Sequence, residues 1–256
     1  MIPIRIETRP PLAWVTLDRP EKHNALSAAM WAELPVIARN LAADQSLRVV
    51  LVRGAGTEAF SAGADISEMH TNLADPARMR AMQDATQSGQ EAWFNLPLAT
   101  IAVIRGACVG GGCGLAIASD LRLATPDAYF AITPAKLGLA YSLADTRRLL
   151  DLVGPARAKE ILYTGGKFTA SEALGMGLIN RIVPANDLDA AAEKLALEIA
   201  ANAPNSVRTT KEIVNGILRG QRLETTASIA AFNDSFGSPE FLEGAAAFRE
   251  KRRPQF

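Results

Sequence analysis

The chain has 256 residues, enough to bury a substantial core as one large domain or as a main domain with a smaller appendage. Its 27 Lys and Arg residues balance 27 Asp and Glu residues, so the net charge gives no reason to expect nucleic acid or a membrane surface as a partner. The N-terminus lacks the apolar core of a signal peptide, and no stretch reaches transmembrane length, so we expect a cytoplasmic protein. Cys108 and Cys113 match no zinc or redox spacing, so we expect two reduced thiols and no metal site.

The first part of the chain predicts alternating strands and helices, which is typical of an α/β domain. Two β-rich runs between residues 2 and 18 are separated by Pro10 and Pro11. Ser27 is a suitable N-cap for a helix that reaches Ala43, and Pro35 inside it predicts a kink or a boundary. Further strands are predicted at 47–52, 100–105, 121–124 and 129–132, and a long helix at 79–95.

Helical patterns dominate after residue 142, interrupted by one predicted strand at 178–183. We place a soft boundary near residue 195. Residues 1–195 are then the core, and residues 196–256 form a helical region that covers the core or packs on a neighbouring subunit. The predicted helices are 142–152, 155–163, 170–174, 188–203, 206–219, 223–236 and 239–252.

The most informative stretch is the glycine run 106–120, which predicts a strand, a tight turn and the start of a helix. Three successive glycines, 110–112, let backbone N–H groups face outward beside a helix N-terminus. Close helix packing is the alternative explanation. Residues 60–65 repeat the design, and neither segment matches a nucleotide-binding motif or a nucleophile elbow. If the two turns converge, their N–H groups form an oxyanion hole.

Five segments of the chain carry a family pattern: Arg19 to Leu26, Phe60 to Met69, the glycine run ending in Ser119 and Asp120, Thr169 to Ile179, and Phe248 to Arg252. Together they resemble the crotonase superfamily, the enoyl-CoA hydratase/isomerase family. They occur in the family's order and extend over nearly the whole chain.

The resemblance implies a spiral of ββα turns followed by a C-terminal helical trimerisation region, in trimers or dimers of trimers. It implies an acyl-CoA thioester whose carbonyl oxygen accepts bonds from the amides of Ala64 and Gly111. Coenzyme A would be part of the substrate, so no separate cofactor is expected. By the same resemblance, the coenzyme A contacts are Lys22, His23, Ala25, Ala62, Asp65 and Ile66, with Phe248 and Lys251 from a neighbouring subunit. A solvated basic helix end is the alternative for Lys251, Arg252 and Arg253.

The chain departs from the family where proton transfer is expected. The family's hydratases use two glutamates, one after the glycine-cysteine pair and one shortly before a later glycine. This chain has Gly114 and Pro134 at those positions, and neither can transfer a proton. Ordinary hydration of a 2-enoyl thioester is therefore not expected.

Residues 133–143 resemble the matching stretch of the methylmalonyl-CoA decarboxylase branch, including a tyrosine placed like Tyr141. Decarboxylation of a malonyl-type thioester yields an enolate without an enzyme base. A phenol at this position could donate a hydrogen bond to a carboxylate or a carbonyl. That branch has a histidine at the position of Ala64 and a glutamate at the position of Gly114. Tyr141 could instead be an ordinary buried aromatic residue with a satisfied hydroxyl.

Four other side chains could supply a relocated acid or base. Asp65 opens a helix and suits a capping role, Glu68 one turn later is expected to face solvent, and His70 is expected on the surface. Asp145 is expected to share a helix face with Tyr141 and is the best placed of the four, although we expect it to be exposed on the surface. We therefore expect an enzyme that acts through a thioester enolate, with decarboxylation favoured. The alternatives are a hydratase or isomerase with a relocated acid or base, and a non-catalytic acyl-CoA-binding protein.

Overall fold

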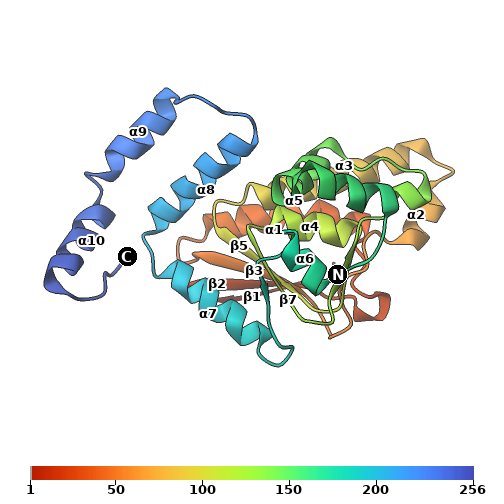
Figure 1. The fold of residues 1–256 in the computed structure, drawn as a ribbon, viewed down its shortest axis with the longest axis horizontal. Coiled ribbons are helices and arrows are strands. Elements are labelled where there is room, and N and C mark those ends of the chain that lie inside the picture. Colours follow the sequence, from red (N-terminus) through yellow and green to blue (C-terminus); the bar gives the residue numbers. More distant parts are fainter. Residues whose placement is uncertain (1) are drawn as a thin grey trace.

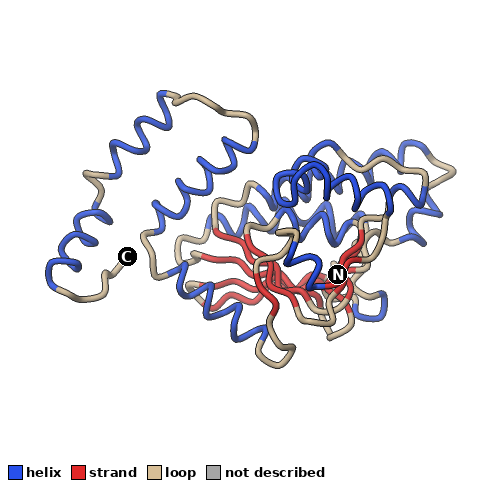
Figure 2. The backbone as a smooth tube through the Cα atoms, in the orientation of Figure 1, coloured by secondary structure: helices blue, strands red, loops and turns tan. Residues whose placement is uncertain are grey.

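The computed structural model describes residues 2–256 and places a twisted sheet between two layers of helices (Figures 1 and 2). Only the first pair of its strands, β1 and β2, is antiparallel; the other neighbours are parallel. This arrangement confirms the α/β prediction. The sheet has six strands in the order β1 (Ile4–Arg9), β2 (Leu12–Leu17), β3 (Val49–Gly54), β5 (Ala99–Ile104), β7 (Leu121–Ala124) and β10 (Arg181–Ile182).

The central strands are apolar on both faces because helices cover both sides of the sheet. Alternate residues of one strand point to opposite faces, as Val49 and Val50 show. Val49 packs in the cluster that α7 (Leu188–Ala200) completes, whereas Val50 packs in the larger core. Helices α1 (Ala28–Ala43), α3 (Pro76–Phe94), α4 (Gly111–Ala118) and α5 (Leu143–Thr164) lie on that larger-core side.

A second, four-stranded sheet has the order β4 (Ala59–Ser61), β6 (Ala107–Val109), β8 (Tyr129–Ala131) and β9 (Phe168–Thr169). The sequence did not predict β4 or β6. The expected direct step from strand to helix in the glycine run is wrong, because β6 lies between Gly106 and the helix α4. These two short strands run parallel to each other, so their C-terminal ends deliver the two glycine turns to the same edge.

Ser27 caps α1 as predicted, its side chain accepting a bond from the amide of Met30 at 3.3 Å. The expected boundary at Pro35 is wrong, since the helix continues to Ala43 with Leu34 and Ile37 buried. Packing of this face against the sheet outweighs the one lost backbone bond. The two helices predicted at 142–152 and 155–163 are confirmed: α5 is divided at Gly154, which has non-helical dihedrals.

The last three helices form an arm that extends away from the sheet (Figure 1). Position 195 falls inside α7, which packs on the sheet, and the arm begins after α7. Several large apolar side chains on the arm are exposed, among them Phe232, Phe236 and Phe248. None of the helices in residues 2–256 is long and apolar enough to cross a membrane. The arm consists of α8 (Pro204–Leu218), α9 (Thr226–Ser235) and α10 (Pro239–Glu250); the short helices elsewhere are η1 (Pro20–Lys22), α2 (Ile66–Asn72), η2 (Pro134–Leu137) and α6 (Ala170–Gly175).

Candidate active site

The turns that follow β4 and β6 meet, and they bring the amides of Ala64 and Gly111 together. A Cβ atom built on Gly63 would lie 3.3 Å from the amide nitrogen of Gly111, and one built on Gly111 would lie 3.7 Å from the amide nitrogen of Ala64. The two segments are far apart in sequence, and the parallel pairing of Ser61 with Cys108 aligns them. The convergence on which the oxyanion hypothesis depends is therefore present.

Neither the Ala64 N–H nor the Gly111 N–H is used by the backbone hydrogen bonds of its own turn. Ala64 forms a parallel bridge with Leu26, in which Leu26 donates to Gly63 at 2.7 Å and Asp65 donates to Leu26 at 3.1 Å. These bonds use the neighbours of Ala64, so its own N–H points away from Leu26. Gly111 is the first residue of α4, where an N–H has no acceptor within the helix. Two N–H groups and the positive end of a helix dipole thus lie side by side.

Glycine is required where the two turns touch. Gly63 has a φ of +100°, and a Cβ there would lie 2.8 Å from the carbonyl oxygen of Val109. A Cβ on Gly112 would lie 2.6 Å from the carbonyl oxygen of Ser61. Any side chain at either position would separate β4 from the start of α4.

Asp65 links the first turn to the loop after β2. Its side chain caps α2 by accepting from the amides of Ser67 and Glu68, as expected, and it also accepts from Arg19 at 2.9 Å and Lys22 at 3.1 Å. Burial alone would raise the pKa of Asp65, but these hydrogen bonds and charges lower the pKa to about 2. An acid this strong stays ionised, so Asp65 is a structural anchor rather than a proton carrier.

The residues expected to contact coenzyme A fall into two separate places. The loop 22–26 lies along residues 62–65, since Ala62 donates to the carbonyl of His23 at 2.9 Å. Phe248 and Lys251 are exposed at the end of α10, on the arm, far from α2 in Figure 1. Arg252 is ion-paired with Glu243 at 2.6 Å. At the loop 22–26 and residues 62–66, four of the expected contact residues are exposed: Lys22, His23, Ala62 and Ile66. The other two, Ala25 and Asp65, are buried.

The space beside Gly114 is filled by Gln90 of α3. A Cβ on Gly114 would overlap the terminal carboxamide atom of Gln90 and would lie 3.7 Å from the hydroxyl oxygen of Tyr141. With its amide group toward α5, Gln90 donates to Asp145 Oδ2 at 3.0 Å and to Oδ1 at 3.1 Å. Sequence reasoning missed Gln90, since the only signal is a small residue at 114 that leaves room for a larger one from elsewhere.

The hydroxyl of Tyr141 is buried and has no hydrogen-bond partner within residues 2–256. The expectation of a satisfied hydroxyl is therefore wrong for this residue. Burial, together with the nearby Asp145 carboxylate, raises the pKa of Tyr141 well above its usual value, so the phenol stays protonated. An unpaired donor of this kind next to Gly114 is a group in need of a ligand or a water molecule.

Asp145 is buried, so the expectation of surface exposure is wrong. It accepts from Ser142 Oγ at 2.7 Å and from Arg148 at 3.2 Å, in addition to Gln90. Burial raises the pKa of Asp145, while the bonds from Ser142 and Arg148 oppose the rise. Both α3 and α5 pack on α4, and side chains from α3 and α5 enclose the carboxylate that the helical spacing alone placed at the surface.

The other two candidate proton carriers lie apart from this cluster. Glu68 does not simply face solvent: it is half-buried and accepts from the amide of Ala28 at 2.9 Å, at the start of α1. His70 is exposed on α2, as expected. Pro134, the second position at which a glutamate was expected, begins η2.

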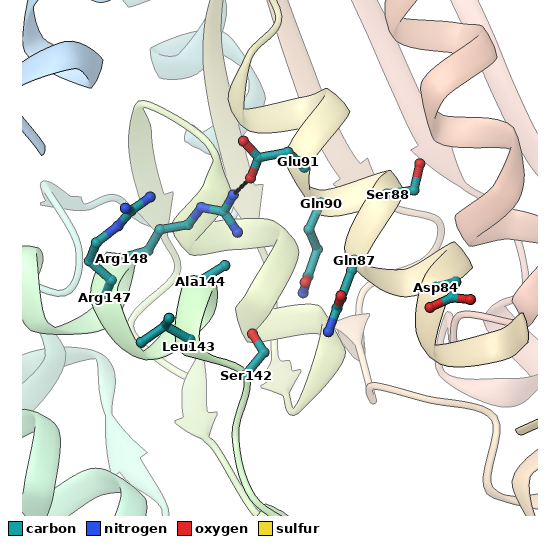
Figure 3. Close-up of a pocket in the computed structure, with 10 residues that line it drawn as sticks. All are labelled: Asp84, Gln87, Ser88, Gln90, Glu91, Ser142, Leu143, Ala144, Arg147 and Arg148. Atoms are coloured by element: carbon teal, nitrogen blue, oxygen red, sulfur yellow. Dashed lines mark hydrogen bonds and ion pairs between the residues drawn. The ribbon is translucent and has the colours of Figure 1, made fainter. Parts of the chain in front are cut away.

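A cleft of about 530 Å³ lies between α3 and the first turns of α5 (Figure 3). Arg148 crosses it to form an ion pair with Glu91, and the Gln90 side chain extends toward the start of α5. Its lining is mainly polar: Asp84, Gln87, Ser88, Gln90, Glu91, Ser142, Leu143, Ala144, Arg147 and Arg148.

Comparison with known proteins identifies the class of fold and site. The family model described as enoyl-CoA hydratase/isomerase matches residues 7–256. A structure of an enoyl-CoA hydratase/isomerase family protein from Hyphomonas neptunium is 43% identical, with a TM-score of 0.96 over 99% of this chain and 97% of that one. The short-chain-enoyl-CoA hydratase of Clostridium acetobutylicum is 32% identical over 97% of this chain and 95% of its own length. YngF of Bacillus subtilis, whose name describes it as an enoyl-CoA hydratase/isomerase, is 35% identical over 94% of this chain and 93% of its own length.

The chain therefore belongs to the enoyl-CoA hydratase/isomerase family of the crotonase superfamily. Its fold is the crotonase fold with a C-terminal helical region, as the resemblance implied. The family is one of enzymes that act on acyl-CoA thioesters.

Proposed function

We propose that this chain decarboxylates a malonyl-type acyl-CoA. The thioester oxygen would be held between the amides of Ala64 and Gly111. The observation that carries the proposal is at Gly114, where a side chain that could transfer a proton is replaced by the carboxamide of Gln90. An amide can neither activate water nor protonate carbon at neutral pH, and Pro134 offers no proton at the second position.

Loss of carbon dioxide leaves its bonding electrons on the α-carbon, so the enolate forms without a base. The two amides stabilise the negative charge that develops on the thioester oxygen. The α-carbon then takes one proton from water, which completes the shortened acyl-CoA, and the hydroxide left behind is neutralised by the solvent. The hydroxyl of Tyr141, protonated and unpaired beside Gly114, would donate a hydrogen bond to the departing carboxylate or to the enolate. Coenzyme A would lie along the loop 22–26 and residues 62–66, with Phe248 and Lys251 supplied by a neighbouring subunit of a trimer or a dimer of trimers.

A hydratase or isomerase with a relocated acid is the second candidate, because Asp145 is a buried carboxyl with a raised pKa. Its two oxygens are bound by Ser142, Arg148 and Gln90, and Gln90 lies between it and Gly114. This enclosure favours a positioning role for Asp145 over direct proton transfer. A third candidate, a non-catalytic acyl-CoA-binding protein, would keep the two amides without any turnover.

Incubation of the purified protein with methylmalonyl-CoA and with crotonyl-CoA, followed by mass spectrometry, separates the three candidates. We expect the malonyl-type ester to lose 44 mass units, the mass of carbon dioxide, and crotonyl-CoA to stay unchanged. Rapid addition of water to crotonyl-CoA would refute the proposal and favour Asp145 as a relocated acid. Binding of both esters without conversion of either would favour the non-catalytic alternative.

A further inference from the structure

Gln90 is the only side chain that both lines the cleft between α3 and α5 and occupies the space at Gly114, within residues 2–256. It is 3% exposed, so it forms the floor of the cleft rather than its rim. One face of its carboxamide meets the cleft, and the end of the carboxamide meets α4. Gln90 thus lies between the cleft and the Gly114 side of the candidate active site.

The Gln90 side chain therefore forms a wall at this point, and helix geometry gives its position relative to the amides of Ala64 and Gly111. Gly111 and Gly114 are one turn apart on the same face of α4, which corresponds to about 4.5 Å along the helix axis. That distance is spanned by three or four carbon–carbon bonds. An acyl chain that starts at the Gly111 amide and follows α4 would therefore meet Gln90 a few carbons beyond the carbonyl.

The wall is held in place from a second helix. Asp145 of α5 accepts two bonds from the Gln90 amide, and Asp145 is itself fixed by Ser142 and Arg148. Moving Gln90 aside would leave a buried carboxylate without one of its donors, which is costly. Beyond Gln90 the cleft exposes apolar as well as polar surface, so it could accept an alkyl chain if the Gln90 side chain were shortened.

We infer that Gln90 is a specificity-determining residue that limits this site to short acyl groups. The inference rests on the proposed function for the placement of the thioester oxygen. It narrows the substrate class to acyl-CoA esters with few carbons beyond the carbonyl, such as a malonyl-type ester with a small α-substituent. Asp145 is then a positioning residue that keeps the wall closed.

The test is binding rather than turnover, so it is independent of the reaction. Isothermal titration calorimetry would follow propionyl-, butyryl-, hexanoyl- and octanoyl-CoA with the wild-type protein and with Gln90→Ala. We expect the wild type to bind octanoyl-CoA at least tenfold more weakly than butyryl-CoA. Gln90→Ala joins the cleft to the site and should restore most of that tenfold loss, with propionyl-CoA changed by less than about threefold.

Gln87→Ala is the matched control, because Gln87 lies one turn earlier on α3 and lines the same cleft without contacting Gly114. It should keep the wild-type profile. Gln90→Asn keeps an amide on a shorter stem and should give an intermediate profile, which protects the test if Gln90→Ala unfolds. Equal wild-type affinity for butyryl- and octanoyl-CoA, or the same profile in wild type, Gln90→Ala and Gln90→Asn, overturns the inference. Failure to decarboxylate any ester, with the chain-length profile as expected, refutes the proposed reaction alone.

Discussion

The two halves of the candidate site are built from different parts of the chain. The half that would stabilise charge consists of backbone amides, fixed by the pairing of β4 with β6 and by glycines that admit no side chain. The half that would handle protons consists of Gln90 of α3 and Tyr141, which lie beside Gly114 of α4, and Asp145 of α5, which is bound to Gln90. In the second half, a small residue on α4 is matched by a larger one on α3. The comparison teaches that proton chemistry can be altered by exchanging side chains while the charge-stabilising half stays intact.

The sharpest way to break this comparison is to disturb the backbone half. Gly63→Ala places a Cβ 2.8 Å from the Val109 carbonyl oxygen and 3.3 Å from the Gly111 amide, at a φ of +100°. The two amides should move apart, and we expect decarboxylation to slow by about 10²–10³-fold, the usual cost of a lost oxyanion donor. Single-turnover rates with methylmalonyl-CoA measure the effect.

Gly220→Ala controls for backbone strain in that experiment. Gly220 has the same φ of +100°, but nothing lies within 4 Å of its Cβ position. It should lose stability through strain yet keep the wild-type rate. Equal rates in Gly63→Ala and wild type would contradict the assignment of Ala64 and Gly111 as the oxygen-binding amides.

The second prediction concerns the half of the site that is built from side chains. The substitution Tyr141→Phe should lower the rate without lowering the stability. Tyr141→Phe removes a donor that has no partner within the described residues, so the free energy of unfolding should stay the same or rise slightly. Loss of a hydrogen bond to a charged group should slow decarboxylation by about ten- to a hundredfold. Steady-state rates and urea unfolding measure the two effects.

Tyr163→Phe serves as the control, because Tyr163 is exposed on α5 and should change neither quantity. A marked loss of stability in Tyr141→Phe would indicate a structural hydroxyl instead. An unchanged rate would remove Tyr141 from the proposed mechanism.

The same comparison explains what could be predicted from the sequence. The glycine pattern at 60–65 and 106–112 reports a backbone geometry directly, because only glycine fits where the turns touch, and it raised the possibility that the two turns converge. The resemblance to the family, and not the pattern, singled out Ala64 and Gly111. Gln90 carries no such signal, since an amide on α3 is equally at home in solvent. Its contact with Gly114 and its bond to Asp145 depend on how three helices pack, which no single periodicity encodes. For the same reason, the sequence led us to expect Asp145 to be exposed, whereas the structure shows it buried.

The third prediction tests whether the backbone half depends on charge. The pKa of Asp65 is lowered to about 2 from an unfolded value near 3.8, so its stabilising effect is present above pH 4 and is lost as the pH falls toward 2. Asp65→Asn keeps a capping oxygen but loses the ion pairs with Arg19 and Lys22. The wild type should exceed the variant by about 2 kcal/mol in free energy of unfolding at pH 7.

That difference should shrink steadily between pH 4 and pH 2 in urea unfolding experiments. Asp75→Asn is the control, since Asp75 also caps a helix but its ion-pair partner Arg78 is largely exposed. It should show a smaller difference at pH 7. A difference for Asp65→Asn that does not vary with pH would mean that capping, and not the buried ion pairs, accounts for the effect.

The smallest predicted effect is also the most direct test of the exchange between α4 and α3. Gly114→Glu alone should be destabilising because its Cβ overlaps Gln90, whereas Gln90→Ala removes the overlapping atoms. In a double-mutant cycle, Gln90→Ala should therefore cost about 1 kcal/mol less in the Gly114→Glu background than in the wild type. Gln87→Ala, which lines the same cleft away from Gly114, should show no such coupling. If the effects of Gly114→Glu and Gln90→Ala on the free energy of unfolding simply add, then Gln90 does not occupy the space that a side chain at position 114 would need. The contact between Gln90 and Gly114 would then not explain the small residue on α4.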